Sequence, residues 1–108
     1  NLQKLNLRDN LLATLPNSFA QLKKLEWLDL KANDLTQLPD NFSELTGLKE
    51  CNLSMNLKLN HELEFAKFRK MQGLTLLDLS YNNITKERIE VLRAAMPNCA
   101  VINWDYKK

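Results

Sequence analysis

Residues 74–82 read LTLLDLSYN, with leucines at positions 74, 77 and 79 and an asparagine at position 82. The same spacing occurs in three earlier segments of the chain, which begin at Leu2, Leu25 and Leu48. A weaker fifth copy runs from Cys99 to position 107. Successive copies start 23, 23, 26 and 25 residues apart, so the sequence predicts a protein built from structural repeats.

Each copy predicts a short β-strand followed by a turn. Apolar and polar residues alternate around the second and third leucines, which indicates a strand with one buried and one exposed face. The asparagine that follows has a side-chain amide that can bridge the turning backbone. We therefore expect the copies to stack with parallel strands and a ladder of asparagine hydrogen bonds.

The segments between the copies predict short helices. Leu15-Pro16 and Leu38-Pro39 open two brief returns, each long enough for one or two helical turns. The third return predicts a helix over residues 61–71, capped by Asn60, and the fourth a helix from Lys86 to about Ala95, capped by Thr85. Lys58 stands where the other copies have leucine or isoleucine, so we expect the third turn to be distorted.

Size and composition limit the possible functions. The chain has 108 residues, enough for one domain, with 44% apolar and 26% charged residues. Its formal charge of +2 is scattered rather than gathered into the basic stripe that nucleic acid needs. No apolar run approaches the roughly 20 residues of a membrane-spanning helix. We therefore expect neither nucleic acid nor a membrane as a partner.

The residues that usually carry chemistry are sparse. His61 is the single histidine, so no zinc-protease motif can be read. The two glycines exclude a glycine-rich phosphate-binding loop, and no Cys/His cluster has metal-ligand spacing. Cys51 and Cys99 are predicted to lie two strands apart as reduced thiols, too distant for a disulfide. We expect no catalytic residue, no cofactor and no metal site.

The four copies and the weaker fifth resemble the leucine-rich-repeat family over almost the whole chain. The first two repeats resemble the 23-residue class of Ras suppressor and Erbin-like scaffold proteins. The ending, residues 89–102, looks more like the closing repeats of bacterial members. The resemblance implies one α/β domain over residues 1–108, a horseshoe segment with a parallel concave β-sheet and short convex helices. It would comprise about four repeats and a C-terminal capping strand, as part of a longer protein.

The family resemblance also implies a function. Family members are overwhelmingly recognition modules, so we expect a non-enzymatic segment that binds a protein partner on its concave strand face. Two other roles stay open: a structural spacer or cap of a larger receptor or scaffold, and the substrate-recruiting segment of a larger enzyme. The paired-cysteine caps of extracellular members are missing, which favours the cytoplasm, although a secreted protein is not excluded.

Side chains between and just after the strand leucines are expected to face outward. Those that are apolar or aromatic form a streak suited to anchoring an interface. Asp and Asn between the two strand leucines are more often structural. The residues predicted to contact the partner are Trp27, Asp29, Met55, Leu76, Asp78, Tyr81 and Tyr106. Val101 is assigned to the same streak, and Trp104 is expected to cover the last core layer.

The first repeat predicts a second kind of contact. Stacked repeats bury their faces only against neighbours, so terminal repeats need a polar cap. Leu2, Leu5 and Leu7 have no such cap in the sequence. We therefore expect either further repeats before Asn1 or end-to-end self-association at the N-terminal repeat.

Overall fold

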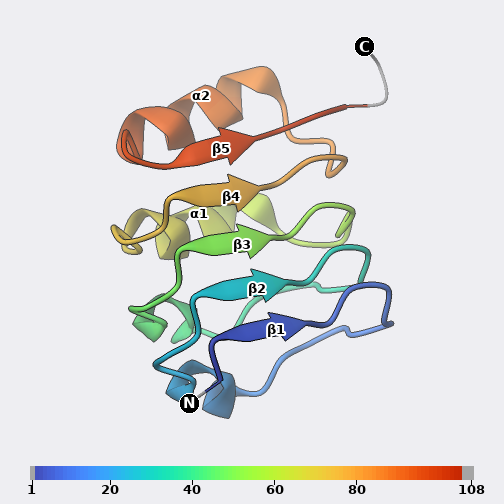
Figure 1. Cartoon of the computed structure of the whole chain (residues 1–108). Coiled ribbons are helices and arrows are strands. Elements are labelled where there is room, and N and C mark those ends of the chain that lie inside the picture. Colours follow the sequence, from blue (N-terminus) through green and yellow to red (C-terminus); the bar gives the residue numbers. More distant parts are fainter. Residues whose placement is uncertain (1, 106–108) are drawn as a thin grey trace.

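Five short parallel strands form one sheet whose spatial order follows the chain. The computed structural model describes residues 2–105 and, for His61, only the main chain. The strands are β1 (Lys4–Asn6), β2 (Trp27–Asp29), β3 (Glu50–Asn52), β4 (Leu76–Asp78) and β5 (Ala100–Ile102), ordered β1-β2-β3-β4-β5 (Figure 1). Each repeat therefore adds one strand beside the last, and the predicted solenoid with a parallel sheet is confirmed.

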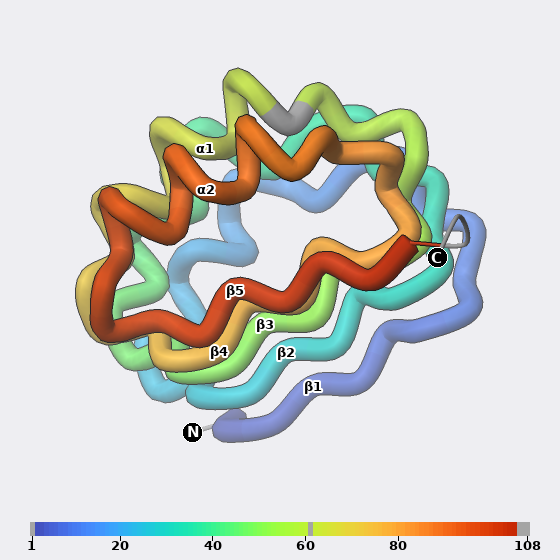
Figure 2. The backbone as a smooth tube through the Cα atoms, turned by 90° about the horizontal axis from the view of Figure 1, so that it is seen from above, coloured from blue at the N-terminus to red at the C-terminus, as the bar shows by residue number. Residues whose placement is uncertain are grey.

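Helices lie across the core from the sheet. Seen from above, each repeat is one coil, with its strand on one side and its return on the other (Figure 2). The returns of the first two repeats contain 3-10 helices η1 (Asn17–Gln21) and η2 (Phe42–Glu44). The later returns contain α1 (His61–Arg69) and α2 (Lys86–Ala95). All four match the predicted positions, and the predicted caps are present. Asn60 accepts a hydrogen bond from the Leu63 N–H at 3.4 Å, and Thr85 accepts one from the Arg88 N–H at 3.3 Å.

The core is a stack of leucine layers between the strands and the helices. The central strand residues Leu28, Cys51 and Leu77 are paired in register and fully buried. Phe42 and Phe68 fill the side of the core next to the returns. Cys51 therefore takes a strand-leucine position as predicted, and its burial raises the pKa of its thiol.

The third turn is distorted, as its Lys58 predicts. Lys58 is exposed, and Leu59, one residue later, enters the core instead. The Leu59 N–H donates to the Asn56 carbonyl at 3.1 Å, which closes this longer turn. Leu57 is exposed, as are Leu11 and Asn83 at the same place in their repeats.

The predicted register of the fifth repeat was wrong by one residue. Val101, not Ile102, pairs with Leu77, and it is buried in the core. Hydrogen bonds from the Ala100 N–H to Thr75 O and from the Leu79 N–H to Ile102 O, both 2.8 Å, set this register. Because a one-residue slip reverses every side chain, Ile102 and Trp104 face outward and Val101 does not. Trp104 is 57% exposed, so it does not cover the last core layer.

The two ends of the stack differ. At the β5 end, α2 closes the core over Ile89 and Val101, which are both buried. The Arg93 side chain also donates from Nε and Nη2 to the Val101 carbonyl, at 3.1 and 2.8 Å. At the β1 end Leu5 and Leu7 are only partly buried, and Leu11 is 86% exposed. The better closure expected at the C-terminal end is present, but α2 and Arg93 provide it.

Candidate binding face

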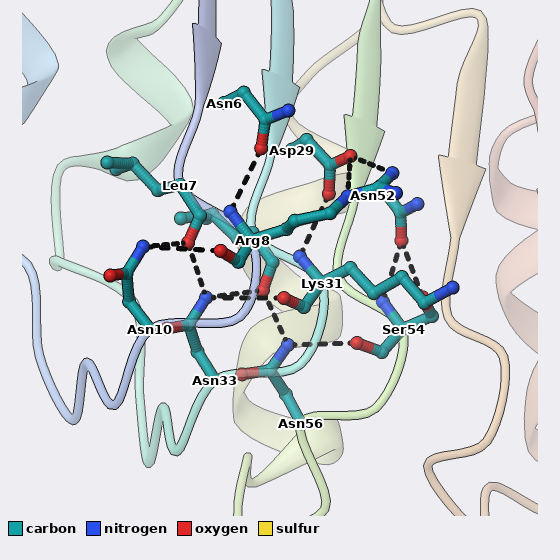
Figure 3. Close-up of polar contacts among 11 residues, drawn as sticks. Asn6, Leu7, Arg8, Asn10, Asp29, Lys31, Asn33, Asn52, Ser54 and Asn56 are labelled. Atoms are coloured by element: carbon teal, nitrogen blue, oxygen red, sulfur yellow. Dashed lines mark hydrogen bonds and ion pairs between the residues drawn. The ribbon is translucent and has the colours of Figure 1, made fainter.

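The exposed side of the sheet, called the strand face here, consists of the outward residues of β1–β5 and of the turns after them. At the end of each of the first four strands, an Asn or Asp holds the following turn. The side-chain oxygens of Asn6, Asp29, Asn52 and Asp78 each accept the N–H of the residue two positions later, at 2.9–3.0 Å (Figure 3 shows the first three). The structural interpretation of this Asn/Asp column is therefore confirmed.

Asp29 is a predicted contact residue that the structure places below the surface. Its exposed fraction is 0%. The Arg8 Nε donates to Asp29 Oδ2 at 2.8 Å, and Arg8 Nη2 forms an ion pair with the same oxygen (Figure 3). The hydrogen bond to Asp29 and its charge raise the pKa of Arg8. At this point of the strand face, the exposed charged side chain is therefore Arg8, and Asp29 lies buried beneath it.

Below the turns, asparagines of successive repeats form the predicted ladder. Asn33, Asn56 and Asn82 are all buried. Asn56 Nδ2 donates to Leu53 O in its own repeat at 3.1 Å and to Leu30 O in the preceding repeat at 3.0 Å. Asn33 and Asn82 make the same pair of contacts (Figure 3 shows Asn33 and Asn56). The ladder fixes the spacing of the coils and hence of the strand face.

Most predicted contact residues lie at the surface of this face. Trp27, Leu76, Asp78 and Tyr81 are half-buried, and Met55 is 37% exposed. Tyr106 lies outside the described residues, and the corrected register places Asp105 in the column of Tyr81. Sequence reasoning missed the outward positions of Ile102 and Trp104. We call the outward apolar and aromatic residues the apolar patch: Trp27, Met55, Leu76, Tyr81, Ile102 and Trp104.

Two members of the apolar patch adopt a strained main-chain conformation. Met55 and Tyr81 have φ angles of 59° and 60°, in the left-handed region. Asp9 and Ala32 occupy the same place in their repeats with φ near 60°, so the turn itself requires this conformation. Aspartate and asparagine tolerate it, whereas other side chains pay about 1–2 kcal/mol. The repeat motif marks this position in the sequence, because the residue directly precedes the ladder asparagine in each of the first four repeats.

The strand face offers contacts rather than a reaction centre. Within residues 2–105, no three His, Cys, Asp or Glu side chains are grouped so as to hold a metal ion. A pocket of about 550 Å³ lies at the β5 end of the stack, between α2 and β5, and its lining includes Ile84, Ile89 and Arg93 together with Ile102 and Trp104 of the apolar patch. In the described part of the chain, no helix is long and apolar enough to cross a membrane.

Known proteins share this sequence pattern and this fold. Models of the family described as "Leucine rich repeat" match residues 1–35 and residues 73–94. Among solved structures, a leucine-rich-repeat protein of Leptospira interrogans is similar, with a TM-score of 0.78 and 32% sequence identity. The match covers 93% of this chain and 25% of that protein, so this chain spans a quarter of its length. The search of curated proteins found no match.

Proposed function

Because this chain belongs to the leucine-rich-repeat family, we propose that it is a non-enzymatic recognition module that binds a protein partner on its strand face. Leucine-rich-repeat domains generally mediate interactions between proteins. The strand face suits this role, because the ladder and the buried leucines hold its strands in fixed register. A partner would meet a surface that is already ordered, which lowers the entropy cost of binding.

The apolar patch is the observation that carries the proposal. It places Trp27, Tyr81 and Trp104 among polar turn residues on one side of the sheet. Tyrosine and tryptophan are enriched among the side chains that dominate binding energies at interfaces. Met55 and Tyr81 add to the argument, because each occupies a left-handed position that asparagine or glycine would fill at lower cost. A purely structural turn has no need for these larger side chains.

The proposal assigns contact roles to Trp27, Met55, Leu76 and Tyr81 from the sequence prediction, and to Ile102 and Trp104 from the observed register. Asp78 lies among them, half-buried, with Oδ1 bound to the Ser80 N–H. Asp29 contributes indirectly by holding Arg8. A spacer without a specific partner, or a recruiting segment of a larger enzyme, would use the same fold.

Variants on opposite sides of the coil separate these possibilities. Trp27→Ala, Tyr81→Ala and Trp104→Ala each remove a large side chain from the strand face. Val91→Ala is the matched control, because Val91 is an exposed apolar residue on α2, across the core. The parent chain is used as bait, each captured protein is purified, and its affinity for every variant is measured by calorimetry.

We expect the three strand-face variants to lose about 2 kcal/mol of binding free energy, roughly thirtyfold in affinity. Val91→Ala should bind as the parent does. A partner that binds all four variants with the parent affinity would contradict the proposal. If only Val91→Ala weakens binding, the partner contacts the helices instead.

A further inference from the structure

One row of the strand face combines unlike side chains in fixed register. The first residues of the five strands are Lys4, Trp27, Glu50, Leu76 and Ala100. Trp27 pairs with Glu50, and Glu50 pairs with Leu76. Adjacent strands lie about 4.8 Å apart, and paired residues project from the same side of a sheet. Glu50 is therefore flanked directly by an indole ring and an aliphatic side chain.

The carboxylate of Glu50 has no cationic partner within the described residues. Glu50 is exposed on the central strand, and none of the ion pairs formed among residues 2–105 includes it. Asp78, on the next strand, adds a second carboxylate to this side of the face. Among the other charged residues of this face, Asp105 lies at the β5 end, whereas Lys4, Arg8, Asp9 and Lys31 lie toward the β1 end, where Arg8 is already bound to Asp29.

An arginine side chain matches this row. Its planar guanidinium stacks on a tryptophan ring and pairs with a carboxylate through two parallel N–H donors. Its methylene groups can lie along an aliphatic neighbour such as Leu76. Resting on the function proposed above, we infer that Trp27, Glu50 and Leu76 form a subsite for one arginine of an extended segment of the protein partner.

The three subsite residues, together with the nearby Asp78, disfavour other side chains at this place. An acidic residue would be repelled by Glu50 and Asp78. An apolar residue would cover the Glu50 carboxylate without giving it a hydrogen bond, which costs free energy. Lysine can pair with Glu50, but its compact ammonium lacks the plane that stacks on an indole. The subsite therefore selects for charge and for shape.

Tryptophan signals give a direct test. The chain has two tryptophans, so the indole N–H resonances of Trp27 and Trp104 can be assigned with the variants Trp27→Phe and Trp104→Phe. The probe is a short capped peptide with one arginine between alanines, titrated into the ¹⁵N-labelled 108-residue chain. Peptides with citrulline or lysine in place of the arginine serve as comparisons, because citrulline keeps the shape and removes the charge.

We expect the arginine peptide to shift the Trp27 indole signal saturably and more than that of Trp104. Its affinity should exceed those of the citrulline and lysine peptides by about three- to tenfold. Glu50→Gln and Trp27→Leu should each reduce it by a similar factor. Glu87→Gln is the control, because Glu87 is an exposed carboxylate on α2 that forms no ion pair with any of residues 2–105.

Equal affinities for the arginine and citrulline peptides, or unchanged binding by Glu50→Gln, would overturn the subsite. Equal binding of the lysine peptide would overturn the stacking on Trp27. These outcomes are distinct from failure of the proposed function, which is decided by the captured partner and the variants Tyr81→Ala and Trp104→Ala. A strand face that binds its partner through Tyr81 and ignores arginine would keep the function and lose the subsite.

Discussion

The side chain of Glu64 accepts a hydrogen bond from the main-chain N–H of Leu38 at 3.3 Å, and so joins α1 to the return of the preceding repeat. One turn along α1, Lys67 Nζ donates to the Leu38 carbonyl at 2.6 Å and to Glu64 Oε1 at 3.1 Å. Both polar groups of the Leu38 main chain are therefore satisfied by side chains. Glu64 is fully buried, so this contact places a carboxyl group inside the stack.

Glu64 should make stability depend on pH. Burial raises the pKa of Glu64, and the hydrogen bond and charge of Lys67 offset part of that rise. Because the carboxyl pKa is higher in the folded chain than in the unfolded chain, its contribution to stability is lost as pH rises through the folded value. The free energy of unfolding of the parent, relative to Glu64→Gln, should therefore fall as pH rises above 4.5, the ordinary value for glutamate.

Urea denaturation of both proteins at several pH values measures this difference. Glu90→Gln is a suitable control, because Glu90 is exposed and its pair with Arg93 lies on the helix surface. A difference between parent and Glu64→Gln that stays constant or grows with pH would show that burial does not control this carboxyl group.

Gly47 and Gly73 occupy the same place in successive repeats but differ in the space around them. A Cβ atom on Gly47 would lie 2.8 Å from Lys23 O, whereas one on Gly73 would meet Thr46 O at an ordinary 3.6 Å. We expect Gly47→Ala to reduce the free energy of unfolding by about 1–3 kcal/mol, because main-chain atoms must move. Gly73→Ala should be close to neutral. Thermal melts of the two variants test the contrast, and equal melting temperatures would refute it.

The asparagine ladder should stabilise the chain only where it is enclosed. Asn56 is fully buried and bonded to two repeats, so Asn56→Ala leaves main-chain carbonyls without partners. We expect a loss of about 2–4 kcal/mol in the free energy of unfolding. Asn10→Ala removes the equivalent but exposed residue, whose Nδ2 bonds Leu7 O within its own repeat, and should cost below about 1 kcal/mol. Chemical denaturation compares the two, and a larger loss for Asn10→Ala would argue against the ladder.

The β1 end should make the 108-residue chain self-associate. Leu2, the first leucine of its repeat, is exposed there, while the first leucines of the next two repeats, Leu25 and Leu48, are buried. Leu11, in the same coil as Leu2, is also exposed. Sedimentation velocity should show concentration-dependent association that is reduced in the double variant Leu2→Glu, Leu11→Glu. Leu63→Glu, on the exposed side of α1, is the control and should associate as the parent does. A parent chain that stays monomeric up to about millimolar concentration would contradict this prediction.

Core mutations should separate stability from binding. Leu53 is fully buried, so Leu53→Ala is expected to cost about 2–5 kcal/mol of stability. Trp27 and Tyr81 lie on the strand face, and their replacement by alanine should change the free energy of unfolding by about 0.5 kcal/mol or less. Calorimetric melts of the three variants provide the comparison. Melting of the Trp27 and Tyr81 variants well below the parent would place these side chains in the core.

The repeat motif predicted most of the fold, because its leucines and asparagines act locally in every coil. The helix caps at Asn60 and Thr85 and the distortion at Lys58 also followed from single residues. The fifth repeat was misjudged because it offers Val101 and Ile102 as adjacent apolar residues. Periodicity alone does not decide which of the two faces the core, and main-chain pairing with β4 decides it.

The candidate site was predicted less completely than the fold. The motif identified which positions face outward, so Trp27, Met55, Leu76 and Tyr81 were found at the surface. It gave no sign that Arg8 covers Asp29, because that contact joins residues 21 positions apart and depends on the side chain of a neighbouring repeat. Trp104 was missed for the same reason as Val101, since both assignments depended on the register of β5.

Arg93 gives the stack a direction of growth. Its guanidinium donates to Val101 O, the carbonyl that would otherwise accept a main-chain N–H from a sixth strand. In addition, Asn103 stands two residues after Val101, at the place that Leu79 has after Leu77 on the preceding strand. A gene encoding such an array can gain coils by duplication on the β1 flank without disturbing existing contacts. Extension past β5 requires changes at both Arg93 and Asn103. Anyone who builds longer arrays from this unit should therefore fuse new coils before β1 and keep α2 and β5 as the fixed terminus.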